Sequence, residues 1–142
     1  MTINAGATNN IYNNTVYLNA TNSGNLNFST AALYMNAGTT NDLKNNIFVN
    51  KSVPGSTGKA VAFWKGATGF TNVSTGTNKN IYYAGTPDAT HLIYFETGNP
   101  KPTIDEYLAF IATKDQLSVA EDVPFVGDSR TIDLHIASGT PT

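Results

Sequence analysis

The sequence contains no cysteine among its 142 residues. That absence excludes a disulfide framework, a thiolate metal site and a cysteine nucleophile. Charge is also scarce, because charged residues make up 13% of the chain, about half the usual share. No run of about 18 apolar residues occurs, so the sequence predicts no membrane-spanning helix and no membrane insertion.

Basic residues are too few and too scattered to form the dense positive face that nucleic-acid binding requires. Residues 1–87 carry five lysines and one aspartate, a net charge of +4, whereas residues 88–142 carry nine acidic residues and three basic ones, a net charge of −6. We therefore expect no nucleic-acid partner. The same count leaves Asp42 as the single carboxylate side chain before residue 88.

Amide and hydroxyl side chains supply the polarity that charge does not. The chain has 18 asparagines and 20 threonines. Threonine fits the pleated surface of a strand, and asparagine tolerates the left-handed backbone of a sharp bend. Apolar residues make up 40% of the chain, which is enough for a buried core. The composition therefore favours one β-rich domain, or a piece of one.

Three related stretches recur along the chain, each with a short apolar piece, an asparagine bend and a β-rich run. They are Ile11–Asn19, Leu43–Asn50 and Asn78–Tyr83. Asn14, Asn46 and Asn80 head the three copies and are 32 and 34 residues apart. A fixed period of this size indicates a repeat architecture. We expect the three asparagines to stack as a ladder in which each amide pairs with the next.

A second set of strands keeps nearly the same period. Ala31–Met35, Ala60–Trp64 and His91–Phe95 begin 29 and 31 residues apart, although loops of unequal length precede them. Two or three short strands in each repeat of about 30 residues are typical of a parallel β-helix. The sequence therefore predicts an all-β fold, a parallel β-helix of about three coils with an asparagine ladder.

The inward face of these strands is ambiguous. Val16 and Leu18 look buried in the first copy, whereas Ile47 and Val49 do so in the second, and a shift of one residue inverts the faces. The second set of strands is apolar on both faces. Its side chains are expected to form two columns, one on each face. The first column contains Ala32, Val61, Leu92, Tyr34, Phe63 and Tyr94. The second column contains Leu33, Ala62, Ile93, Met35, Trp64 and Phe95. One column must point outward, and an exposed apolar stripe usually has a cover.

A helix follows the predicted coils and is a candidate for that cover. Asn99–Pro102 indicates a chain break, and Thr103–Glu106 is a capping box that starts a helix over residues 104–112. The apolar face of this helix contains Ile104, Tyr107, Leu108 and Ile111.

The remaining sequence predicts a tail with one more strand at Ile132–Ile136. We expect two parts in the chain. Residues 1–97 form the coils, and residues 98–142 form a C-terminal helix and capping tail packed on them.

The order of these motifs resembles that of right-handed parallel β-helix proteins of the pectate-lyase-like superfold. It is similar in particular to the C-terminal end of long surface β-helix proteins of Bacteroidota-type bacteria. The segments that carry the resemblance are Tyr12–Leu18, Leu43–Asn50, Tyr83–Pro87, Asp115–Ser118, Pro124–Phe125 and Asp133–Ile136. The resemblance covers residues 8–142 and implies a right-handed coil and a secreted or cell-surface module, often within a larger chain. It implies no catalytic residues, and in such relatives the sequence continues beyond the equivalent of Gly139–Thr142.

Polysaccharide cleavage is the main enzymatic alternative, since many β-helix proteins cut or bind acidic polysaccharides. A hydrolase needs two or three carboxylates on one face, and a lyase needs Ca²⁺ ligands, a base and usually a basic group nearby. The coils offer only Asp42 before residue 88 and no arginine. A carboxylate pair on stacked strands is therefore excluded across the first two coils, and we expect no enzymatic activity.

The acidic residues of the tail lack the spacing of a known calcium motif. They are Asp115, Glu121, Asp122, Asp128 and Asp133. We expect solvated loop charges and no cofactor, with Ca²⁺ as the alternative. His91 and His135 fall on predicted strands without a neighbouring His or Cys, so packing or surface positions are favoured over metal ligation.

The leading hypothesis is a non-enzymatic structural or adhesion module of a larger secreted or surface protein, which forms a layer or fibre. Its open ends would pair with other coils or copies of the same protein. The alternative is a carbohydrate-binding or carbohydrate-cleaving domain of the same fold, with cell-surface polysaccharide as ligand. Its candidate contacts are the aromatic residues Tyr34, Phe63, Tyr94 and Trp64. Exposed rings would stack on sugars, but core packing is the favoured interpretation.

Overall fold

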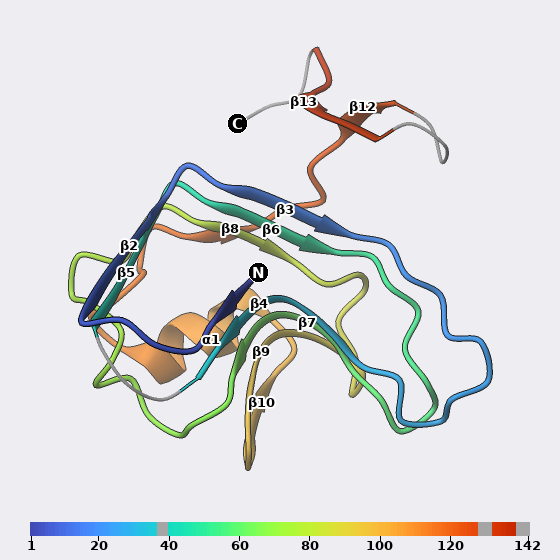
Figure 1. The fold of residues 1–142 in the computed structure, drawn as a ribbon, viewed down its shortest axis with the longest axis horizontal. Helices are drawn as coiled ribbons and strands as arrows, with labels where there is room; N and C mark the ends of the chain where they lie inside the picture. Colours follow the sequence, from blue (N-terminus) through green and yellow to red (C-terminus); the bar gives the residue numbers. More distant parts are fainter. Residues whose placement is uncertain (37–39, 128–131, 139–142) are drawn as a thin grey trace.

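The computed structural model describes residues 1–36, 40–127 and 132–138. The chain is mainly β, with parallel sheets and one short helix in these ranges (Figure 1). None of the helices that they contain is both long and apolar enough to cross a membrane. Asp128 and the segment Gly139–Thr142, both considered above, lie outside the described residues.

Three sheets of mainly parallel strands lie around a common interior (Figure 1). The largest contains β1 (Thr2–Ile3), β4 (Thr30–Met35), β7 (Ala60–Lys65), β9 (His91–Glu96) and β10 (Asn99–Lys101), in that order. The second contains β11 (Val119–Ala120), β8 (Ile81–Tyr83), β6 (Ile47–Asn50) and β3 (Thr15–Leu18). The third pairs β2 (Thr8–Tyr12) with β5 (Thr40–Lys44). A separate antiparallel hairpin contains β12 (Phe125–Gly127) and β13 (Ile132–Ile136).

Each stretch of the sequence repeat lies beside its copy in the next repeat. We call each repeat a coil: coil one contains β2–β4, coil two contains β5–β7, and coil three contains β8 and β9. Thr15 pairs with Ile47, and Ile47 pairs with Ile81, all in parallel. Side chains at equivalent positions therefore stack about 4.8 Å apart, the spacing of neighbouring strands.

The register of the largest sheet differs from the expected one by one residue in coil one. Leu33, Phe63 and Tyr94 are paired across β4, β7 and β9, and Tyr34 pairs with Trp64 instead. The expected column that joined Tyr34 to Phe63 and Tyr94 is therefore wrong. These strands are apolar on both faces, so a shift of one residue changes little in the hydrophobic pattern, and the pattern could not select the register.

The strands of the largest sheet curve sharply (Figure 1). Ala62 and Phe63 are consecutive, yet both are buried in the same core cluster. Strict alternation would place them on opposite faces. Ala32, at the equivalent position of β4, is buried in the same cluster.

The core is rich in aromatic rings that contact one another within and between sheets. Phe48 of β6 and Tyr82 of β8 stack with ring centroids 5.8 Å apart, and Tyr82 lies 6.2 Å from Phe63 of β7. All three are fully buried, which stabilises the fold by about 1.5–3 kcal/mol for each ring. Val16 pairs with Phe48 and packs against the same core, so the inward face of the second sheet is the face of Val16 and Phe48.

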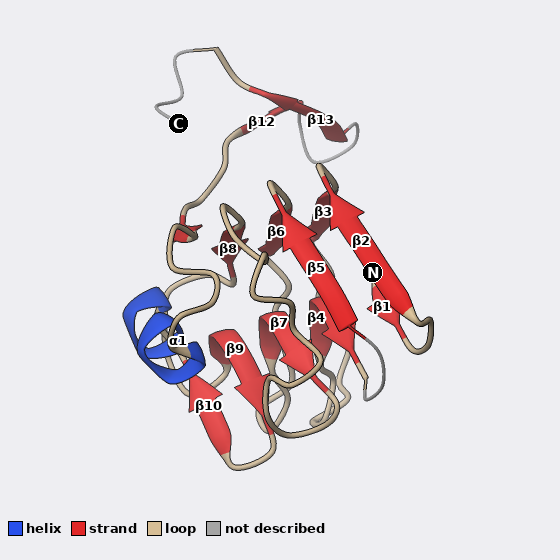
Figure 2. Ribbon diagram, turned by 90° about the vertical axis from the view of Figure 1, so that its left-hand side faces the viewer, coloured by secondary structure: helices blue, strands red, loops and turns tan. Residues whose placement is uncertain are grey.

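The helix α1 (Ile104–Ile111) lies at one end of the stacked strands (Figure 2). The predicted capping box is confirmed: Thr103 Oγ1 accepts the Glu106 N–H, and the Glu106 carboxylate accepts the Thr103 N–H. The Tyr107 ring is buried 5.6 Å from the ring of Tyr82. The helix therefore covers the end of the core rather than an outer apolar column.

The strand β10 occupies the stretch that the sequence marks as a chain break. It pairs antiparallel with β9, with Pro100 opposite Phe95. Proline is tolerated because β10 is an edge strand, where the missing N–H group breaks no ladder. The expected division of the chain between residues 97 and 98 stays a prediction, and it falls in the turn between β9 and β10.

The segment that includes residues 122–125 runs along the outer face of the second sheet. Asp122 Oδ1 lies 2.6 Å from Lys51 Nζ, and the Phe125 ring packs edge-on against Tyr17 with centroids 5.6 Å apart. Val49, which pairs with Tyr17 on that face, is fully buried. The outer face of this sheet is therefore covered in part by the C-terminal tail.

Candidate functional site: the asparagine ladder and an aromatic strip

Asn14, Asn46 and Asn80 stack in register, each just before a strand of the second sheet. Asn14 Nδ2 donates to Asn46 Oδ1 at 3.0 Å, and Asn46 Nδ2 donates to Asn80 Oδ1 at 2.9 Å. The backbone N–H groups of Asn14 and Asn46 donate to the same two oxygens, at 3.0 and 3.1 Å. The structure therefore places the three asparagines in one ladder, and Asn46 and Asn80 are fully buried.

The residue before each ladder asparagine makes the bend. Asn13, Asn45 and Lys79 have φ angles of 56°, 54° and 58°. Asparagine adopts this left-handed conformation readily, whereas for lysine it costs roughly 1–2 kcal/mol. The two consecutive asparagines of the first two copies thus have separate roles, the first in the bend and the second in the ladder. The third copy keeps only the ladder asparagine and has Lys79 in the bend, which explains its weaker sequence signal.

The ladder ends on a carboxylate that the sequence did not identify as its partner. Asn80 Nδ2 donates to Asp115 Oδ1 at 3.0 Å, and the Asn80 N–H donates to Ser118 Oγ at 2.7 Å. Asp115 Oδ2 accepts the hydroxyl groups of Tyr82 and Tyr107, each at 2.8 Å. The Ser118 hydroxyl also donates to Asp115 Oδ1. Asp115 is only 1% exposed, so these four donors replace water around its carboxylate.

Burial raises the pKa of Asp115 above its ordinary value, because desolvation disfavours the carboxylate, although the four donors act in the opposite direction. Burial also raises the pKa values of Tyr82 and Tyr107, and the nearby carboxylate adds to this effect. The network joins β8, α1 and the ladder. Asp115 follows the helix in a loop outside every periodic pattern, so no sequence signal could have placed it there.

An aromatic strip crosses the outer face of the largest sheet. Tyr34, Trp64 and Phe95 pair across β4, β7 and β9, and all three are partly exposed. The Trp64 and Phe95 rings meet edge-on with centroids 4.8 Å apart. Of the residues expected to contact a ligand, Tyr34 and Trp64 lie in this strip. Phe63 and Tyr94 lie on the inward face of the sheet and are fully buried in the core, so they are not available for contact.

Neighbouring groups hold the strip in place. Lys59 Nζ lies 5.4 Å from the centroid of the Phe95 ring. A Cβ atom at Gly66 would lie 2.4 Å from the Tyr34 hydroxyl oxygen, so the glycine makes room for this side chain. The strip therefore offers ordered aromatic surface on three adjacent strands.

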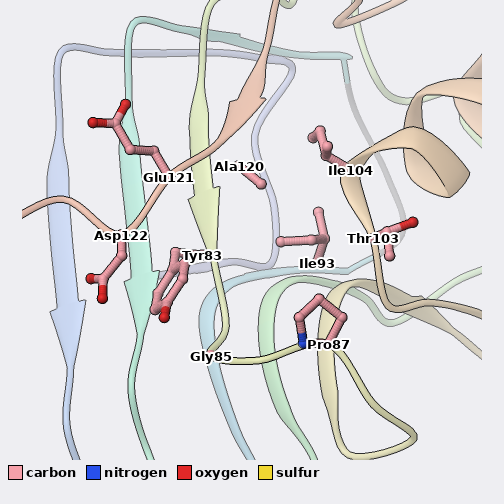
Figure 3. Close-up of a pocket in the computed structure, with 9 residues that line it drawn as sticks. All are labelled: Tyr83, Gly85, Pro87, Ile93, Thr103, Ile104, Ala120, Glu121 and Asp122. Carbon is pink, nitrogen blue, oxygen red and sulfur yellow. The ribbon is translucent and has the colours of Figure 1, made fainter. Parts of the chain in front are cut away.

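A cavity of about 230 Å³ lies between the end of β8, β9, the start of α1 and the chain after β11 (Figure 3). Ile93 and Ile104 give it apolar surface, and Tyr83 lies at its side. The carboxylates of Glu121 and Asp122 point away from the apolar residues (Figure 3). The cavity lining therefore presents no pair of carboxylates that converge on one point.

Asp42, the single carboxylate of the first two coils, forms a partly buried ion pair. It lies 2.7 Å from Lys44 Nζ and accepts the Tyr12 hydroxyl at 2.5 Å. Burial would raise the pKa of Asp42, but the bonds from Lys44 and Tyr12 outweigh that effect and lower it. A general acid needs a raised pKa, so this environment does not favour acid catalysis.

The remaining acidic and histidine side chains are dispersed. His91 contacts Asp88, and His135 contacts Asp133. In the ranges that the structure describes, no three His, Cys, Asp or Glu side chains are close enough together to hold a metal ion.

Comparison with known proteins gives no relative: no family model, no curated protein and no solved structure matches the chain. A function for this molecule therefore follows from the ladder, the strip and the cavity themselves.

Proposed function

We propose that the chain forms about three coils of a right-handed parallel β-helix and acts as a non-enzymatic structural and adhesion module of a secreted or cell-surface protein. The ladder carries this proposal. Asn46 and Asn80 are buried, and the three asparagines bond to neighbouring coils rather than to a solvent-facing site. A stack of coils held in this way contacts only its neighbours and extends in one dimension, as a stalk or fibre requires.

The distribution of carboxylates supports a role without catalysis or a cofactor. A glycosidase needs two carboxyl groups about 5–10 Å apart that face one substrate. Asp42 is tied to Lys44, Asp122 is tied to Lys51, and Asp115 is buried in the core. The partners of this module would be other coils or copies of the same protein, which meet the end of the stack.

The first test is enzymatic. We expect purified protein to release neither reducing ends nor unsaturated products from pectin, alginate or similar acidic polymers, with or without added Ca²⁺. Heat-denatured protein serves as the blank. Product formation that disappears in the Asp42→Asn variant would overturn the proposal, because the substitution removes the only carboxylate of the first two coils.

Carbohydrate binding is the second candidate function, and the aromatic strip favours it. Tyr34, Trp64 and Phe95 expose ring surface on adjacent strands. Aromatic rings bind the apolar faces of sugar rings and carry polar groups at their edges. A surface polysaccharide laid across the strands would contact several rings at once.

If the strip binds polysaccharide, we expect Trp64→Ala to reduce the fraction retained on an insoluble polysaccharide about five- to tenfold, a loss of about 1–1.4 kcal/mol. Tyr17→Ala is the matched control, because Tyr17 is a partly exposed aromatic residue on another sheet. Equal retention of both variants, or no retention of the original chain, would remove this candidate function and leave the structural role.

A further inference from the structure

The two ends of the stacked strands differ (Figure 2). At one end α1 covers the core, and Asp115 and Ser118 accept the last amide donors of the ladder. At the other end β1, β2 and β3 each have a paired strand on one side only, within the residues that the structure describes. Edge strands of this kind present unpaired N–H and C=O groups to a partner.

The ladder has a direction. Asn46 Oδ1 accepts two donors from Asn14, and Asn80 Oδ1 accepts two donors from Asn46. By the same geometry Asn14 Oδ1 would accept the backbone N–H and the side-chain amide of an asparagine in a preceding coil. No bond to that oxygen comes from the described residues, and Asn14 is partly exposed. The open end is therefore an acceptor end.

The edge of the second sheet continues this pattern. The Ile47 N–H donates to the Asn14 carbonyl, and the Lys51 N–H donates to the Leu18 carbonyl. In a parallel ladder the equivalent N–H groups of coil one, those of Thr15 and Asn19, point toward the open side. They would donate to carbonyl groups of a preceding coil.

The strand β1 marks where such a coil would join the stack. Thr2 pairs with Tyr34 and Ile3 pairs with Met35, so β1 occupies the place of the last strand of a preceding coil. Four residues separate Ile3 from Thr8, as four separate Met35 from Thr40, and Thr8 pairs with Thr40. The chain thus already contains the end of one more repeat in the correct register.

We propose that the end formed by β1, β2 and β3 binds a further coil of polypeptide, which runs parallel to β2 and β3 and brings an asparagine that donates to Asn14 Oδ1. This inference rests on the proposed structural function and names its partner. Two copies joined through their open ends would place two Asn14 acceptors together without a donor. A copy joined by its other end would offer no ladder donor, because the donors of Asn80 are already bonded to Asp115 and Ser118.

The test adds the missing coil. Residues 8–33 are duplicated and fused in front of Thr2, so that the inserted Leu33 precedes Thr2 as it precedes Tyr34 in the original chain. We expect the amide protons of the original Thr15 and Asn19 to exchange at least about 100-fold more slowly in this tandem chain. The matched control carries Asn14→Ala in the inserted copy only, and it should lose most of that protection.

Folding of the tandem chain is monitored at Phe48 and Tyr82, whose strands lie inside the stack. The proposal would be overturned if the amide protons of Phe48 and Tyr82 were protected from exchange while the exchange rates of Thr15 and Asn19 stayed unchanged. If the fusion lost protection at Phe48, a synthetic peptide of residues 8–33 added to the original chain is the second measurement, and no slowing at Thr15 would also overturn it.

Sedimentation of the original chain over a range of concentrations tests whether a second copy of the chain occupies the open end instead. A monomer is expected, whereas a dimer that protects Thr15 would identify a second copy as the occupant and overturn the proposal. These outcomes are independent of the polysaccharide assays, so the partner could be wrong while the non-enzymatic role stands.

Discussion

Replacement of Asp115 by alanine is expected to lower the free energy of unfolding by about 3–5 kcal/mol. The substitution leaves four donors without their acceptor: the amide of Asn80 and the hydroxyl groups of Ser118, Tyr82 and Tyr107. All four lie in the buried part of the molecule, where water cannot replace the carboxylate. Urea unfolding followed by circular dichroism measures the change.

The Asp115→Asn variant separates the charge from the hydrogen bonds. It keeps an acceptor for Asn80 and should lose much less stability than Asp115→Ala. A loss below about 1 kcal/mol for the alanine variant would contradict the role of Asp115 as the end of the ladder.

The stability of the original chain is expected to depend on pH in a way that the stability of Asp115→Asn does not. The pKa of Asp115 is raised in the folded state above its ordinary value of 3.8. As the pH rises from 3.8 toward the folded-state pKa, the unfolded chain releases its proton first, so the free energy of unfolding should fall over that interval. Asp115→Asn should lack this fall. Unfolding curves from pH 3 to pH 7 for both proteins provide the comparison.

Replacement of Asn46 by alanine is expected to lower the free energy of unfolding by about 2–4 kcal/mol. Asn46 Oδ1 accepts two bonds from Asn14, and Asn46 Nδ2 donates to Asn80 and to the Ile11 carbonyl. The alanine removes these side-chain bonds at a fully buried position, and Asn80 Oδ1 keeps only the bond from the backbone N–H of residue 46. Thermal and urea unfolding both report the loss.

Asn25→Ala is the matched control for this substitution. Asn25 is exposed, and its side chain accepts only the Asn27 N–H among the bonds of the described residues. We expect a loss of less than about 1 kcal/mol for the control. Similar losses of unfolding free energy for Asn46→Ala and Asn25→Ala would mean that the ladder contributes no more to stability than a surface turn does.

The ladder and most strand positions could be predicted because they repeat. Asn14, Asn46 and Asn80 keep one period, and that period is imposed by the pairing of successive coils. The capping box at Thr103 was also predictable, since it depends only on two residues three positions apart. A capping box and a regular repeat can both be recognised in a single sequence.

The register of the largest sheet and the identity of the exposed rings could not be predicted. Ala62 and Phe63 are both buried where β7 curves, so the alternation that assigns faces fails at that point. Trp64 and Tyr34 therefore form the strip together, and Phe63 does not. Asp115 was missed for another reason: two of its partners, Asn80 and Tyr82, lie 35 and 33 residues earlier in the chain, and no pattern links them to it.

The closure of the stack by α1 and Asp115 also constrains the order of events during synthesis. The carboxylate that completes the ladder follows Asn80 by 35 residues, so the ribosome releases the coils before the group that completes them. Successive rungs join residues 32, 34 and 35 apart, and loop closures of such similar length have similar entropic costs. The rings of Tyr82, Tyr94 and Tyr107 meet at the last rung, and their contacts offset part of that cost. Folding is therefore expected to begin after residue 115 has emerged and to proceed as a zipper, in the direction opposite to translation.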